Sequence, residues 1–174
     1  MAVDKRSLWD MYTKSGKQFM RLRNWPEAER MFAAALQVAE EFGPRDPRLG
    51  VALNNAAHVN QARRRYAKAE ALYRRALDIA LKAHGQDHPD TAVNLANLAG
   101  LYHAQDLQSQ AEPLYRQAID TLARTLGDGH PSLARLLEGY GALLAKMGRH
   151  EEAAGVQGRA RSIRDRKADP ETPA

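Results

Sequence analysis

The stretch GQDHPDT at residues 85–91, together with the histidine before it, gathers residue types that often bind metal ions. His84 and His88 are four positions apart, the spacing of two ligands on one face of a helix, and Asp87 could add a carboxylate. However, Gly85 is expected to end one helix before a proline begins the next, so the histidines need not share a helical face. Turn chemistry explains the same residues, and we predict no metal site.

The same loop recurs along the chain at a fixed interval. The recurring positions are Gly43, Gly85 and Gly127, and Pro47, Pro89 and Pro131, which are 42 residues apart each time. A fixed period between about 20 and 50 residues is the signature of a repeat architecture. Glycine can end a helix in the left-handed conformation, and proline suits the first turn of a helix. The loop is therefore expected to connect helices.

Composition places the chain among ordinary folded proteins and narrows its chemistry. Of its 174 residues, 44% are hydrophobic and 27% are charged, which is typical of a globular chain. There is no cysteine, which excludes disulfides and thiolate chemistry. We find neither a signal peptide nor the roughly 20 apolar residues of a membrane helix, and so expect a cytoplasmic protein without membrane insertion. The net charge of +5 favours acidic partners.

Between the loops, apolar residues follow helical spacing and no stretch alternates like a strand. The second helix of each repeat places small residues around a larger one, so that two helices can approach closely. These sets are Ala28, Phe32 and Ala35; Ala69, Tyr73 and Ala76; Ala111, Tyr115 and Ala118; and Ala153, Gln157 and Ala160.

This pattern resembles the tetratricopeptide repeat (TPR), and with its period and the DHPDTA loop it is similar to the 42-residue repeats of kinesin light chains and their bacterial relatives. The resemblance implies an all-α, right-handed α-solenoid of four helix-turn-helix units and eight helices, without strands. We expect one solenoid over residues 1–166 and a disordered tail over 167–174. The units are expected at about residues 8–47, 48–88, 89–130 and 131–166.

The resemblance also implies a function, which is to bind a peptide segment of a partner protein on the concave surface formed by the first helices. Helical spacing predicts which residues face this groove, because they lie opposite the apolar stripe. The predicted groove residues are Lys14, Lys17, Arg21, Asn54, Asn55, His58, Gln61, Asn97, His103, Arg135 and Lys146.

Two kinds of side chain in this groove suit a peptide. In peptide-binding members of the family, an asparagine at the place of Asn55 and Asn97 can hold the ligand backbone, since an amide both donates and accepts. Lys14, Lys17 and Arg21 would bind the carboxylates of an acidic or C-terminal segment. We therefore predict a non-enzymatic scaffold or adaptor with no cofactor, because no nucleophile motif, phosphate loop or carboxylate pair occurs in a suitable context.

Two other interpretations stay open. Leu8, Trp9 and Met11 could leave an apolar surface for a second copy of the chain, which would make this a self-association module. A basic group around the turn of the second repeat could bind nucleic acid, although it lacks interleaved aromatic residues and we do not expect it to. Its members are Arg63, Arg64, Arg65, Lys68, Arg74 and Arg75.

Overall fold

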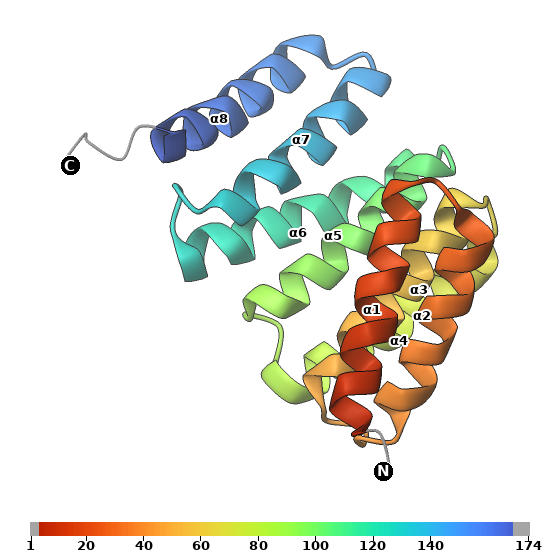
Figure 1. Cartoon of the computed structure of the whole chain (residues 1–174). Coiled ribbons are helices and arrows are strands. Elements are labelled where there is room, and N and C mark those ends of the chain that lie inside the picture. The colour runs from red at the N-terminus through yellow and green to blue at the C-terminus, as the bar shows by residue number, and fades with distance from the viewer. Residues whose placement is uncertain (1–3, 169–174) are drawn as a thin grey trace. The chain divides into compact units, whose positions relative to one another are not determined.

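The computed structural model describes residues 4–168, and within this range every regular element is a helix (Figure 1). The helices form four consecutive pairs, each joined by a short turn. They are α1 (Lys5–Arg21), α2 (Trp25–Glu40), α3 (Pro47–Ala62), α4 (Tyr66–His84), α5 (Pro89–Ala104), α6 (Gln108–Leu126), α7 (Pro131–Lys146) and α8 (His150–Ala168). The last helix includes the first two residues of the predicted tail, and the rest of that tail lies outside the described residues.

The loops between pairs have the turn chemistry predicted from the sequence. Gly43, Gly85 and Gly127 have φ angles of +104°, +82° and +86°, in the region that favours glycine. Each following helix begins with its proline, and the residue before that proline caps the helix. The capping groups are the Asp46 carboxylate, which accepts from Arg48 N, and Nδ1 of His88 and of His130, which accept from Asp90 N and Ser132 N.

The turns inside the pairs share a second backbone feature. The positions are Arg23, Arg64, Asp106 and Gly148, with φ angles of 55°, 57°, 62° and 78°. A left-handed residue ends the first helix of each pair and reverses the chain, and three of the four carry a side chain there.

The described residues divide into two compact halves, with the division between Ala83 and His84. In the N-terminal half, α1 packs on α2 and α2 packs on α3. One core cluster joins Ala39, Leu53 and Ala76 with the partly buried Trp9, and a second joins Phe32 with Val59. Phe32 and Ala76 belong to the small-large-small sets of the second helices, and both are buried as their spacing predicted.

The C-terminal half is built in the same way. Here α5 packs on α6, α7 packs on α8, and α7 also contacts both α5 and α6. Fully buried leucines such as Leu101, Leu122 and Leu137 fill its core. Because α5 and α7 are the first helices of neighbouring repeats, their outward faces together form one surface, which carries the candidate site.

Candidate functional site

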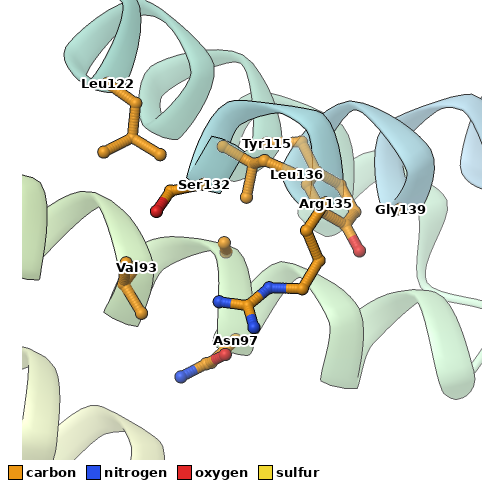
Figure 2. Close-up of a pocket in the computed structure, with 9 residues that line it drawn as sticks. Val93, Asn97, Tyr115, Leu122, Ser132, Arg135, Leu136 and Gly139 are labelled. Atoms are coloured by element: carbon orange, nitrogen blue, oxygen red, sulfur yellow. The ribbon is translucent and has the colours of Figure 1, made fainter. Parts of the chain in front are cut away.

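A hollow in the C-terminal half lies on the surface that α5 and α7 share, and residues of α6 also line it (Figure 2). It combines apolar side chains with an amide, a hydroxyl and a guanidinium. Its lining residues are Val93, Ala96 and Asn97 of α5, Tyr115 and Leu122 of α6, and Ser132, Arg135, Leu136 and Gly139 of α7.

Two of the predicted groove residues, Asn97 and Arg135, line this hollow. Asn97 is half-buried and Arg135 is exposed. Figure 2 shows the Arg135 guanidinium pointing toward Asn97 across the hollow. Arg135 forms no ion pair within residues 4–166, so its charge is not matched by a carboxylate of that segment. A guanidinium in this setting can bind a carboxylate of another molecule through two parallel hydrogen bonds.

Tyr115 lies in the wall of the hollow and was not among the predicted groove residues. Its hydroxyl is close to two glycines of the first helices: a Cβ on Gly139 would lie 2.8 Å from it, and one on Gly100 would lie 3.5 Å from it. Burial raises the pKa of Tyr115 to about 12, so the hydroxyl stays protonated. Glycine at position 139 thus keeps the space beside this hydroxyl open.

The sequence assigned Tyr115 to packing, and its ring does pack, with its centroid 6.0 Å from that of Tyr140. The signal that could have placed its hydroxyl in the groove was the pair of glycines, Gly100 and Gly139, inside helices where glycine is otherwise unfavourable.

The other two predicted residues of this half do not line the hollow. Lys146 forms an ion pair with Asp106, the left-handed residue of the α5–α6 turn. His103 is half-buried beside them, and its pKa is lowered by burial and by Lys146, against an opposing effect of Asp106. Lys146 and Asp106 therefore form an ion pair between neighbouring repeats, outside the hollow.

In the N-terminal half, the predicted basic residues lie on α1. Lys14 and Lys17 are exposed, and Arg21 donates through Nε to the carbonyl of Lys17 at 3.4 Å. No ion pair of these three residues occurs within the described part of the chain. No carboxylate of the described residues therefore competes with a bound ligand for these three side chains.

The predicted polar residues of α3 have mixed surroundings. Asn55 carries a buried amide nitrogen with no hydrogen-bond partner among the described residues, whereas Gln61 accepts from the Tyr73 hydroxyl at 3.1 Å. Asn54 is half-buried and His58 is exposed. A hollow in this half is lined by residues of α2, α3 and α4, and it includes none of the predicted groove residues.

The basic group at the second repeat is largely matched by carboxylates. Arg63, Arg65 and Lys68 all contact the carboxylate of Glu29, with distances of 2.7 Å for Arg65 and 3.4 Å for Lys68. Arg74 pairs with Glu70 at 2.9 Å and Arg75 with Glu40 at 2.8 Å. This arrangement makes the group a poor phosphate-binding surface, since all of its cations except Arg64 already have anionic partners.

The loop that contains His88 is a helix connection, as the turn interpretation predicted. Asp87 pairs with Arg124 at 2.5 Å instead of with the histidines, while the rings of His84 and His88 stack with their centroids 4.2 Å apart. None of the described helices is long and apolar enough to cross a membrane.

Comparison with known proteins places the chain in a family. A family model described as Tetratricopeptide repeat matches residues 10–82, 48–124 and 110–166, which together span most of the chain. No curated protein matches it.

Several solved structures share the fold. BtubC (BKLC) from P. vanneervenii has a TM-score of 0.78 at 22% identity, over 99% of this chain and 69% of that one. A crystal structure of a putative kinesin light chain with nearly identical TPR-like repeats from Podosopora anserina gives 0.72 at 20% identity, over 94% and 77%. The apo form of RapI gives 0.79 at 15% identity, over 97% and 60%.

At these identities the structural matches show the fold alone, and with the family model they confirm the predicted all-α class of TPR helix pairs, with a putative kinesin light chain among the structural neighbours. Repeats of this kind generally mediate protein–protein interaction and are typically non-enzymatic scaffolds. The chain belongs to the tetratricopeptide repeat family.

Proposed function

We propose that this protein is a scaffold that binds an extended segment of a partner protein, and that the hollow between α5 and α7 holds part of that segment. The proposal rests on one observation, which is that Asn97 and Arg135 line the same hollow together with Tyr115. The family resemblance predicted a groove, helical spacing predicted the residues that face it, and two of those residues line this hollow.

The lining chemistry indicates what the segment contains. The Asn97 amide can donate to and accept from one peptide unit whatever its side chain is, which suits an extended backbone. Arg135 can bind the carboxylate of an aspartate, a glutamate or a C-terminus. Val93 and Leu136 offer apolar surface beside these polar groups. The segment is therefore an acidic or C-terminal peptide with an apolar side chain next to its carboxylate.

The predicted residues of the N-terminal half remain candidate contacts for the same kind of ligand. Lys14, Lys17 and Arg21 offer charge for further acidic residues. Asn55 offers a buried amide nitrogen that has no partner among the described residues. Each half can thus be tested separately with its own variants.

Self-association has less support as a function. Leu8 and Trp9 are partly buried, and Trp9 packs against the core cluster of its own half. Only Met11 of that predicted patch is exposed, with half of its surface accessible. Light scattering coupled to size exclusion would test this alternative. The cytoplasmic location expected from the sequence stays a prediction.

A peptide selection tests the proposed function. Random peptides, displayed with free C-termini in one library and as internal segments in another, are selected on the full chain. Enriched peptides are then measured by fluorescence anisotropy against wild type, Arg135→Glu and Arg166→Glu. Arg166 is the matched control, because it is an exposed arginine on α8 of the same half and lies outside the hollow.

We expect acidic or C-terminal sequences to be enriched, and their affinity to fall with Arg135→Glu but not with Arg166→Glu. Enriched peptides that bind both variants as they bind wild type would show that the ligand does not use this hollow.

A further inference from the structure

The turn between α4 and α5 brings the side chains of His84, His88 and Asp90 close together. His84 is the last residue of α4, and His88 and Asp90 lie at the start of α5. Gly85, with φ of +82°, reverses the chain between them, and the Thr91 hydroxyl donates to the Gly85 carbonyl at 2.7 Å. The turn is thus tied by its own hydrogen bond and holds the two helix ends close together.

The three side chains lie close enough to one another to share a metal ion after small movements. The imidazole rings stack with their centroids 4.2 Å apart and their planes 20° from parallel. Oδ2 of Asp90 lies 3.7 Å from Nε2 of His84 and 3.7 Å from Nδ1 of His88. One ligand atom from each residue lies within 4.8 Å of the other two. Ligand atoms of a tetrahedral zinc ion are about 3.3 Å apart, so small side-chain rotations close this gap.

We propose that His84, His88 and Asp90 bind a divalent transition-metal ion of the class that imidazole and carboxylate ligands favour, with Zn²⁺ as its representative. Two neutral imidazoles and one carboxylate give three protein ligands, and water completes the coordination. The absence of a metal site was predicted because Gly85 breaks the helix. The break occurs, and the turn that it makes is what brings the rings together.

The charges around the site act in both directions: the Asp90 carboxylate and the C-terminal end of α4 favour a cation, while the N-terminal end of α5 disfavours one. His84 lies at the C-terminal end of α4, where backbone carbonyls are partly negative, and Asp90 lies in the first turn of α5. Arg124 is the nearby cation of α6, and it is paired with Asp87 at 2.5 Å. The carboxylate of Asp90 is therefore available to the metal while the neighbouring positive charge is compensated.

Metal binding competes with one existing hydrogen bond. Nδ1 of His88 accepts from the backbone N–H of Asp90 at 3.1 Å and so caps α5. A neutral imidazole has a single lone pair, so the ring cannot cap the helix and bind metal at once. Losing the cap lowers the affinity by about fivefold, the equivalent of one capping hydrogen bond. A serine at this position would keep a capping oxygen and remove only the metal ligand.

The test uses the full chain without a histidine tag, titrated with ZnCl₂ by calorimetry near neutral pH. The site variants are His84→Ala, His88→Ser and Asp90→Asn. The matched control is His130→Ser, because His130 caps α7 through Nδ1 in the same way while Leu126 stands where His84 would be. Circular dichroism melts check that each variant folds.

We expect one Zn²⁺ per chain, an affinity at least about tenfold lower in each site variant, and no change in His130→Ser. Because the readout is metal binding, the result is independent of any peptide partner. The proposal is overturned if wild type takes up no zinc, if the folded site variants bind as wild type does, or if His130→Ser weakens binding as much as they do.

Discussion

The backbone of Gly16 in α1 lies directly against the ring of Phe32 in α2: a Cβ atom on Gly16 would be 2.6 Å from Cε1 of that ring. Phe32 is completely buried and cannot move aside without disturbing Val59 and Ala28. We therefore expect Gly16→Ala to lower the free energy of unfolding by about 1–3 kcal/mol through overpacking. Urea denaturation followed by circular dichroism measures the change.

Gly50 provides the control for this prediction. It lies inside α3 of the same half, and a Cβ atom there would meet nothing within 4 Å. Alanine is the better helix former, so Gly50→Ala should raise the free energy of unfolding by up to about 1 kcal/mol. Equal effects of the two substitutions would contradict the packing of α1 on α2.

Arg64 has a left-handed backbone conformation, which is unfavourable for a residue that carries a Cβ atom. Its φ of 57° is left-handed, and the equivalent residue of the last repeat is Gly148. The left-handed region costs a residue with a Cβ about 1–2 kcal/mol, while glycine loses about 0.5–1 kcal/mol of chain entropy on folding. Arg64→Gly should therefore raise the free energy of unfolding by about 0.5 kcal/mol or somewhat more, as measured by chemical denaturation.

The comparison variant is Arg64→Ala, which removes the same charge but keeps a Cβ atom. Arg64→Ala should not raise the free energy of unfolding. If alanine stabilises as much as glycine, then the charge of the side chain and not the backbone angle is the cause.

The fold could be predicted because its rules are local. Gly85 and Pro89 end and begin helices through their own backbone preferences, and the sets around Phe32 and Tyr115 mark where helices cross. The left-handed positions inside the pairs were missed, because three of the four are not glycine and carry no signal in the sequence.

The candidate site was only partly predictable, because side-chain pairing depends on residues far apart in the sequence. Helical spacing found Asn97 and Arg135. It could not show that Lys146 pairs with Asp106 of the preceding repeat, or that Glu29 forms ion pairs with cations of the next repeat. For the two histidines, spacing along a helix did not show that a turn brings their rings together.

The pair of Asp46 and Arg48 should make stability depend on pH in acid. Hydrogen bonds from the Arg48 side chain lower the pKa of Asp46 from 3.8 to about 2. The unfolded chain therefore binds this proton more readily than the folded chain, and the stability from the pair is present above the usual pKa and lost as the pH falls toward about 2. Arg48→Gln should destabilise the protein near pH 7, with a difference from wild type that shrinks below about pH 4.

Urea midpoints of wild type and variant at the two pH values measure this effect. Arg30→Gln is the control, because Arg30 forms an exposed i,i+3 pair with Glu27 at 2.8 Å that should contribute little at either pH. A difference for Arg48→Gln that stays constant down to about pH 2 would contradict the assigned cause of the pKa shift.

The last prediction concerns how Arg135 and Asn97 respond to salt, once a peptide that binds the full chain is in hand. Arg135→Glu should weaken binding most at low ionic strength and flatten its salt dependence, because charges near the surface are screened over a Debye length of about 8 Å in physiological salt. Asn97→Ala should weaken binding by about 1 kcal/mol for each lost hydrogen bond at every salt concentration, because a neutral amide is not screened. Calorimetry at low and high salt separates the two effects, with Arg166→Glu as the control of equal charge change. If Arg166→Glu shifts the affinity as much as Arg135→Glu does, the peptide senses the net charge of the protein and is not held by the hollow between α5 and α7.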